Sequence, residues 1–182
     1  MLLALVGVTG VGKSFFVNET STKLDFKKVH TIRTRPVRHG EDPKYFMSEE
    51  ELDNMYDNGK IAYKFKVFEG EYGYLKDEIF SDDNYIFEMH YTTIYDWKKV
   101  RPDIKTIYIM PNDLNVAKEK TKERKLPKDK EIERLNEIDE HYNNITTNKE
   151  LYSQFDYIFY NNYDEQSVEK LLELVKNIMK NV

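Results

Sequence analysis

A short apolar run followed directly by closely spaced glycines is the feature that most restricts the fold of this chain. Residues 2–6 are all apolar, and the segment GVTGVGKS, from Gly7 to Ser14, comes immediately after them. An unbroken apolar run of this length is typical of a central strand in a parallel sheet, covered on both faces. The residues from Lys13 to Leu24 then predict a helix. A strand, a tight loop and a helix in this order favour an α/β fold.

Strands and helices are predicted to alternate along the rest of the chain. Short apolar runs predict strands at 27–32, 85–89, 104–110 and 155–160. Ile61, Tyr63, Phe65 and Val67 alternate with Ala62, Lys64 and Lys66, which predicts a half-buried strand with the first four on one face and a turn at Gly70-Glu71. Helices are predicted after a capping box at Ser48 and Glu51, around Trp97, across 113–141 with a break at Leu126-Pro127, and after Asp164. This pattern indicates a parallel sheet between helices, with ligands at the carboxyl ends of its strands.

Length and charge exclude several classes of protein. A chain of 182 residues fits one domain, and the lack of cysteine excludes disulfides and thiolate metal sites and favours a reducing compartment. The net charge of −5 argues against a protein that wraps nucleic acid. The apolar start is far shorter than the roughly 20 residues that cross a bilayer. We expect a cytoplasmic protein without a nucleic-acid or membrane partner. The sequence does not indicate its oligomeric state.

The glycine-rich segment has the phosphate-binding pattern G-x-x-x-x-G-K-S. Glycines let backbone N–H groups converge on a polyphosphate, and the N-terminus of the following helix adds positive potential. Lys13 is expected to reach the β- and γ-phosphates of ATP, and the Ser14 hydroxyl is expected to bind Mg²⁺. A glycine-rich turn without a ligand is the alternative. The residues predicted to bind the ATP phosphates are Gly7, Thr9, Gly10, Val11, Gly12, Lys13, Ser14 and Phe15.

A second phosphate site is predicted in the basic loop that follows the second strand. Arg35 and Arg38 place two guanidinium groups three residues apart in an otherwise acidic protein. Paired guanidinium forks suit a phosphate group. A solvated basic turn is the alternative interpretation of this loop.

Together these motifs resemble those of the guanylate kinase family. The resemblance covers nearly the whole chain and is carried by the segment Gly7 to Ser14, Thr31, Arg35-x-x-Arg38-x-Gly40-Glu41, Tyr72-Gly73 and Asp156-Tyr157-x-x-x-Asn161. It implies a P-loop nucleoside monophosphate kinase that uses ATP and Mg²⁺ and acts on small nucleotides. The implied fold is α/β in one domain, 1–182: a core with a mostly parallel five-stranded sheet (about 1–32, 83–112 and 141–182), a small antiparallel acceptor-binding excursion (about 33–82) and a helical lid (about 113–140).

The resemblance also implies roles for individual side chains. Arg124 and Arg134 would join Lys13 as catalytic groups that neutralise the transferring phosphoryl group, although charge alone would place both arginines on an exposed helix surface. The acceptor's monophosphate would be held by Thr31, Arg35, Arg38, Tyr45 and Tyr72.

Three positions depart from the family pattern for reading guanine. The family's carboxylate falls on Tyr63, its small hydroxyl residue on Tyr74, and its acidic pair after the third core strand on Glu88 and His90. A carboxylate accepts two hydrogen bonds from the guanine edge, whereas a tyrosine offers one hydroxyl and a stacking face. Glu88 keeps an acidic residue at the strand end, so we expect the departures at Tyr63, Tyr74 and His90 to change how the base is recognised. Alternatively, Glu88 and His90 form a polar pair at the sheet edge whose hydrogen-bonding groups satisfy each other.

The sequence thus predicts an ATP-dependent phosphotransferase that acts on a nucleoside 5′-monophosphate, GMP or dGMP by resemblance. Two alternatives stay open: a kinase of a modified deoxynucleotide or of ribose 1,5-bisphosphate, and a non-catalytic guanylate-kinase-like module that binds phosphopeptides. Such modules generally lack a working phosphate loop, whereas the loop is complete here. A GTPase is disfavoured because no base-specifying Asn-Lys-x-Asp segment follows.

Overall fold

A parallel sheet forms the centre of the protein. The computed structural model describes residues 1–37, 41–67 and 70–181. Within these residues the main sheet has five strands in the order β2-β6-β1-β7-β8, and each neighbouring pair is parallel. The strands are β1 (Leu2–Val6), β2 (Lys27–Lys28), β6 (Tyr85–Glu88), β7 (Lys105–Pro111) and β8 (Tyr157–Asn161). The predicted α/β class is confirmed.

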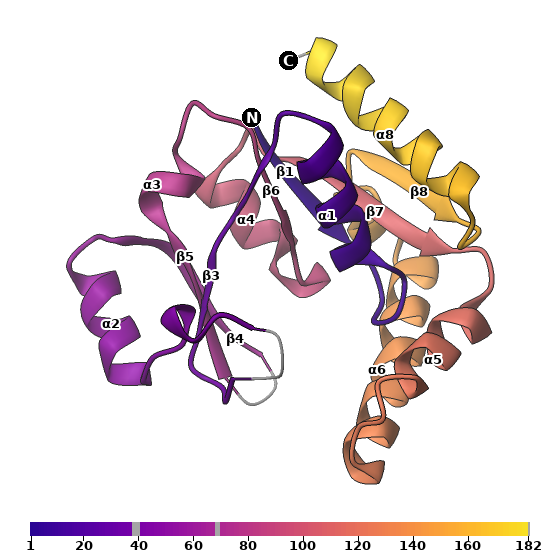
Figure 1. The fold of residues 1–182 in the computed structure, drawn as a ribbon, viewed down its shortest axis with the longest axis horizontal. Coiled ribbons are helices and arrows are strands. Elements are labelled where there is room, and N and C mark those ends of the chain that lie inside the picture. The colour runs from indigo at the N-terminus through magenta and orange to yellow at the C-terminus, as the bar shows by residue number, and fades with distance from the viewer. Residues whose placement is uncertain (38–40, 68–69, 182) are drawn as a thin grey trace.

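Helices cover both faces of this sheet (Figure 1). Successive residues of a strand point to opposite faces, so β1 contributes Leu3 and Leu5 to one hydrophobic cluster and Leu2 and Val6 to the other. The first cluster includes residues of α1 (Lys13–Lys23) and α8 (Glu165–Lys180), and the second includes residues of α4 (Ile94–Val100) and the end of α6 (Lys128–Thr147). Burial on both faces explains why β1 is apolar throughout.

A smaller antiparallel sheet lies beside the main one. Its order is β3-β5-β4, with β3 (Thr31–Arg33), β4 (Ile61–Val67) and β5 (Gly70–Leu75). Helix α2 (Glu49–Asp57) packs Leu52 against Ile32 and Ile61 of this sheet. The helix begins with the predicted capping box, in which Ser48 and Glu51 satisfy each other's backbone N–H groups.

Two helices project from the sheet on the side opposite the antiparallel sheet (Figure 1). They are α5 (Leu114–Lys122) and the first part of α6, and the predicted break at Leu126-Pro127 separates them. We call this pair the lid helices. The remaining short elements are η1 (Pro43–Tyr45), α3 (Lys76–Ile79), η2 (Tyr91–Thr93) and α7 (Lys149–Tyr152). None of the helices in the described ranges combines the length and the apolar character that crossing a membrane requires.

Two strand and turn boundaries predicted between residues 27 and 71 are wrong. The strand expected at 27–32 divides: β2 joins the main sheet, and after Val29 the chain crosses to the antiparallel sheet, where Thr31 pairs with Tyr74. The turn expected at Gly70-Glu71 lies inside β5, since these residues pair with Val67 and Lys66 of β4. Local sequence does not distinguish one strand from two short ones that join different sheets.

A β-bulge changes which β4 side chains share a face. The register shifts between Ile61, opposite Leu75, and Tyr63, opposite Tyr74. A bulge places two residues of one strand against one of the other and reorients the side chains beyond it. Ile61 therefore packs towards Leu52, whereas Tyr63 and Phe65 pack against the main core. The prediction that Ile61 shares the face of Tyr63 is wrong for this reason.

Candidate active site

The glycine-rich loop joins β1 to α1 at the carboxyl end of the central strand. Gly10 and Gly12 have φ of 81° and 92°, in the left-handed region that favours glycine. The Lys13 ammonium donates to the carbonyl oxygens of Gly7 at 2.7 Å and Val8 at 2.9 Å. Burial lowers the pKa of Lys13, and the carboxylates of Glu88 and Glu137 oppose that shift. A half-buried cation thus lies within the loop, where a polyphosphate would meet it.

The other loop residues differ in whether their side chains reach the cavity. Thr9 and Ser14 line the same cavity as Lys13, whereas Val11 is fully buried, and its carbonyl oxygen accepts a hydrogen bond from the Asn161 amide at 3.0 Å. The side chain of Phe15 is 51% exposed and lies outside the cavity lining, so only its backbone is available to a phosphate there. Asn161, which belongs to one of the motifs of the family resemblance, acts structurally here because its amide ties β8 to the loop.

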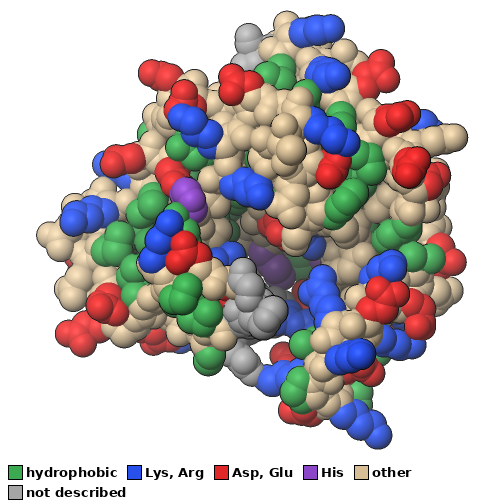
Figure 2. Space-filling view, in the orientation of Figure 1, with side chains coloured by type: hydrophobic (Ala, Val, Ile, Leu, Met, Phe, Trp, Pro, Cys, Tyr) green, Lys and Arg blue, Asp and Glu red, His purple; other side chains and the backbone are tan. Residues whose placement is uncertain are grey.

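A large cavity lies between the loop, the antiparallel sheet and the lid helices. Its volume is about 940 Å³. Figure 2 shows this face of the molecule hollowed, with Lys and Arg side chains around the hollow. Of the predicted site residues, those lining it are Gly7, Thr9, Lys13, Ser14, Thr31, Arg35, Tyr72, Tyr74, Glu88, His90, Arg124 and Arg134. The fold therefore brings most of the predicted donor, acceptor and lid residues to one space.

On the side of the antiparallel sheet, Arg35 is held in a fixed orientation. Its guanidinium donates to both carboxylate oxygens of Glu41, at 2.6 and 2.8 Å, and only 8% of the side chain is exposed. The hydrogen bond to Glu41 raises the pKa of Arg35, and the neighbouring Tyr72 acts in the same direction. Arg33 also lines the cavity and donates to the Thr31 carbonyl oxygen at 3.0 Å. Arg38 lies outside the described residues, so its role stays a prediction.

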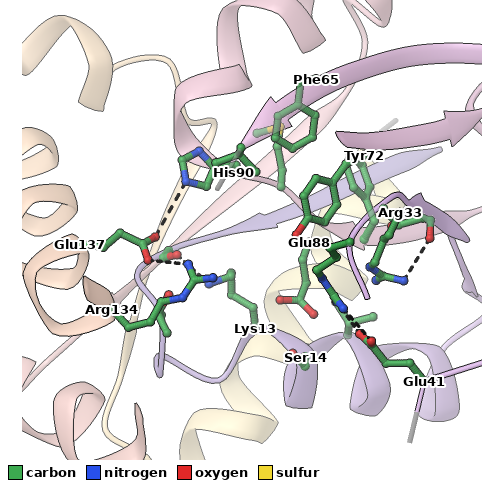
Figure 3. A pocket seen from close by; sticks show the side chains of 18 of the residues that line it. Lys13, Ser14, Arg33, Glu41, Phe65, Tyr72, Glu88, His90, Arg134 and Glu137 are labelled. Carbon is green, nitrogen blue, oxygen red and sulfur yellow. Dashed lines mark hydrogen bonds and ion pairs between the residues drawn. The ribbon is translucent and has the colours of Figure 1, made fainter. Parts of the chain in front are cut away.

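On the side of the lid, Arg124 follows α5 and Arg134 lies on α6. Arg134 donates to Glu137 at 3.0 Å, and the other carboxylate oxygen of Glu137 lies 3.9 Å from Nε2 of His90, which follows β6 (Figure 3). Burial, followed by the charges of Lys13 and Arg134, lowers the pKa of His90 to about 4. His90 is therefore neutral near pH 7 and accommodates two cations beside it.

A buried histidine lies behind this group. His141 of α6 stacks on the Tyr91 ring with centroids 3.7 Å apart, and its Nε2 pairs with the Tyr108 hydroxyl at 3.1 Å. Burial, followed by the charges of Lys13 and His90, lowers the pKa of His141 to about 2. The side chain joins the lid helix α6 to the core strand β7.

Two predicted acceptor-binding residues do not reach the cavity. Tyr45 stacks on His30 with ring centroids 4.4 Å apart and is not part of the cavity lining, and Tyr63 is turned so that its hydroxyl lies 3.4 Å from Asp96 of α4. Tyr74 does line the cavity but is only 2% exposed, because it packs against Trp97. The expected set of acceptor-binding tyrosines is thus brought together only in part.

Three residues that line the cavity were not predicted as site residues from the sequence. Glu41 orients Arg35, Glu137 pairs with Arg134, and Phe65 places its ring beside Tyr72 (Figure 3). Signals for all three exist in the sequence. Glu41 is in the same loop as Arg35, Glu137 follows Arg134 by one helical turn, and Phe65 belongs to the alternating strand.

The residues next to Lys13 fit a magnesium ion. Ser14 lines the cavity at the start of α1, and the Glu88 carboxylate points towards this loop in Figure 3. Hydroxyl and carboxylate oxygens are ligands that Mg²⁺ prefers, together with waters and substrate phosphates. The chemistry of this pair therefore suits a nucleotide-bound magnesium ion.

A glycine-rich loop at the end of a parallel strand, facing arginines from an antiparallel sheet and from the lid helices, is the arrangement of a nucleotide kinase site. A sequence profile described as guanylate kinase matches residues 1–180, so the chain belongs to the guanylate kinase family. It is an enzyme of the nucleoside monophosphate kinase class.

Comparison with individual proteins agrees with this assignment. The chain is 27% identical over 187 residues to guanylate kinases from the Lens and Paris strains of Legionella pneumophila, covering 96% of this chain and 84% of each relative. A crystal structure of guanylate kinase from Anaplasma phagocytophilum shares the fold, with a TM-score of 0.69 and 19% identity over all of this chain and 85% of that one.

Proposed function

We propose that this enzyme transfers the γ-phosphoryl group of ATP, with Mg²⁺, to a nucleoside 5′-monophosphate, and that GMP is among its acceptors. One observation carries the proposal: Lys13 of the phosphate loop and the Arg35–Tyr72 pair line the same cavity, with Arg124 and Arg134 facing them. The names of the Legionella relatives support GMP as an acceptor. The comparisons give no support to a sugar bisphosphate kinase or to a phosphopeptide-binding module.

The donor side is assigned to the loop and the start of α1. Thr9, Lys13 and Ser14 line the cavity where the β- and γ-phosphates would lie, and the backbone N–H groups at the helix N-terminus favour an anion. Lys13 would exchange its two backbone carbonyl partners for phosphate oxygens. Mg²⁺, held by Ser14 and oriented by Glu88, would neutralise charge on the donor phosphates.

The acceptor's phosphate is assigned to Arg35, Tyr72 and Thr31. Glu41 binds one edge of the Arg35 guanidinium and fixes its plane, which prepares the fork for a phosphate at low entropic cost. Arg38 is proposed as the second guanidinium on sequence grounds alone.

The lid arginines are assigned to the transferring group. Phosphoryl transfer depends on alignment and charge neutralisation more than on covalent catalysis, and guanidinium groups supply both. Arg124 and Arg134 approach the cavity from the side opposite Arg35, so they would meet the phosphoryl group between donor and acceptor. An acceptor phosphate oxygen is already anionic, so this scheme requires no general base. We further expect the enzyme to work on free nucleotides in the cytoplasm.

The proposal is tested by following ADP release from ATP and Mg²⁺ with a panel of nucleoside monophosphates, ribose 1,5-bisphosphate and 5-modified deoxynucleotides. We expect turnover with GMP in the wild type and none above background in Lys13→Ala, with circular dichroism and melting showing that the variant is folded. Lys122→Ala, at an exposed position on α5, serves as the control. Wild-type rates in Lys13→Ala, or a panel without any active nucleotide, would contradict the proposal.

A further inference from the structure

Four aromatic side chains form a continuous wall on the antiparallel sheet. Tyr63 pairs with Tyr74 across β4 and β5, and Phe65 pairs with Tyr72. The Phe65 ring lies 5.5 Å from that of Tyr72 and 6.3 Å from that of Tyr74, with interplanar angles of 24° and 5°. The Tyr63 and Phe65 rings are 5.8 Å apart at 13°. We call these four residues the aromatic wall.

The two ends of the wall have different surroundings. At one end Trp97 packs edge-on against Tyr63 and Tyr74, with centroid distances of 5.0 and 4.8 Å. This end is anchored in the core. At the other end Phe65 and Tyr72 line the cavity, and Figure 3 shows their two rings next to each other there. A rigid, flat apolar surface thus faces the space assigned to the acceptor.

Several polar groups beside the wall already have other partners or directions. The Tyr63 hydroxyl lies 3.4 Å from Asp96, and Arg35, which lines the cavity with Tyr72, is bound by Glu41. The Glu88 carboxylate points towards the phosphate loop and away from Phe65 (Figure 3). The wall therefore offers a planar ligand its ring faces more than hydrogen bonds.

Tyr72 connects this surface to the phosphate site. Tyr72 lines the cavity together with Arg35, which would hold the acceptor's phosphate, while its ring belongs to the wall. A nucleotide whose phosphate lies at Arg35 would therefore have the wall within reach of its base.

We propose that the acceptor's base is held by stacking on Phe65 and Tyr72, and that the enzyme accepts purine nucleoside monophosphates as a class instead of guanine alone. This inference rests on the proposed function. Every base has a π-face, so stacking tolerates different bases and favours the larger purines. Strong discrimination requires side chains that pair with the base edge and are left unsatisfied by the wrong base.

The test compares kcat/KM for GMP, IMP, AMP, CMP and ribose 5-phosphate at saturating ATP and Mg²⁺. IMP lacks the 2-amino group of guanine, and AMP reverses its hydrogen-bonding edge. We expect GMP, IMP and AMP to agree within about tenfold, and ribose 5-phosphate to fall at least about tenfold below them because it has no aromatic base to stack. A preference for GMP of about a hundredfold or more over both IMP and AMP would overturn the inference while leaving the proposed function intact. Lack of turnover with every monophosphate would overturn both.

Variants of Phe65 separate stacking from a structural effect. Phe65→Ala should lower kcat/KM for the three purine nucleotides by one common factor of about tenfold or more, and leave ribose 5-phosphate and the KM for ATP unchanged. Phe65→Tyr keeps a ring at this position and should retain most of the purine activity. Phe80→Ala removes a half-exposed ring that stacks on Arg101 away from the cavity, and it should match the wild type. An equal loss for ribose 5-phosphate and purine nucleotides in Phe65→Ala would contradict stacking.

Discussion

Glu137 lies between Arg134 and His90: one of its carboxylate oxygens accepts a hydrogen bond from Arg134 at 3.0 Å, and the other lies 3.9 Å from Nε2 of His90. His90 follows β6 in the main sheet, whereas Glu137 and Arg134 are one turn apart on α6. The Arg134–Glu137 ion pair therefore lies beside the end of a core strand.

Replacement of Arg134 by alanine should reduce kcat by about a hundredfold or more, since one cation that meets the transferring phosphoryl group is lost. The KM values for both substrates should change much less. Steady-state kinetics with both substrates varied will measure this. Lys120→Ala, at a half-exposed ion pair with Glu123 on α5, is the matched control and should have normal kcat. A large rise in the acceptor's KM with unchanged kcat in Arg134→Ala would place Arg134 at the acceptor instead.

Replacement of Arg35 by alanine should raise the KM for the acceptor about tenfold or more and leave the KM for ATP nearly unchanged, because a charge-assisted hydrogen bond to a phosphate is lost. Glu41→Gln should have a smaller effect in the same direction, since the amide supports the guanidinium fork less well. Both KM values are measured in the same assay. Equal effects on ATP and acceptor would contradict the assignment of Arg35 to the acceptor.

Acid should destabilise the protein partly through His141. Its pKa is lowered to about 2 in the folded state and is about 6.5 in an unfolded chain, so below pH 6.5 the unfolded state binds a proton that the folded state does not. Stability is therefore fully retained above pH 6.5 and falls as the pH decreases. Between pH 7.5 and 5.0 the wild type should lose about 2 kcal/mol more unfolding free energy than His141→Gln, which keeps a polar partner for Tyr108. Urea denaturation at both pH values measures the difference, and parallel losses would contradict it.

Gly10 should tolerate alanine much less well than Gly59, although both have positive φ. A Cβ on Gly10 would collide with the carbonyl oxygen of Ala117 in α5, whereas one on Gly59 meets nothing within 4 Å. Gly59→Ala should cost about 1–2 kcal/mol of stability from backbone strain alone. Gly10→Ala should cost clearly more and also reduce activity, because α5 would have to move from the phosphate loop. Urea denaturation and the ADP-release assay measure both effects; equal losses of stability would show that the contact with α5 is unimportant.

Local patterns in the sequence were sufficient for the α/β class and for the strand, glycine-rich loop and helix at the start of the chain. The apolar run of β1, the glycines and Lys13 lie within a dozen consecutive residues, and the contacts that shape the loop are mostly made inside that segment. The capping box of α2 and the break at Leu126-Pro127 were predictable for the same reason. The roles of the arginines depended on a resemblance, since charge alone does not distinguish a lid arginine from an exposed one.

What the sequence by itself determined is therefore the α/β fold class and the strand, glycine-rich loop and helix at the start of the chain, because each is encoded by neighbouring residues. Only the tertiary structure decided which side chains reach the cavity. A bulge of one residue in β4 separates Ile61 from Tyr63, and Tyr63 then faces Asp96 and Trp97, more than thirty positions further along the chain. The approach of His90 to Glu137 is likewise set by how α6 lies relative to the end of β6. Such contacts depend on the packing of whole elements, and no local pattern specifies them.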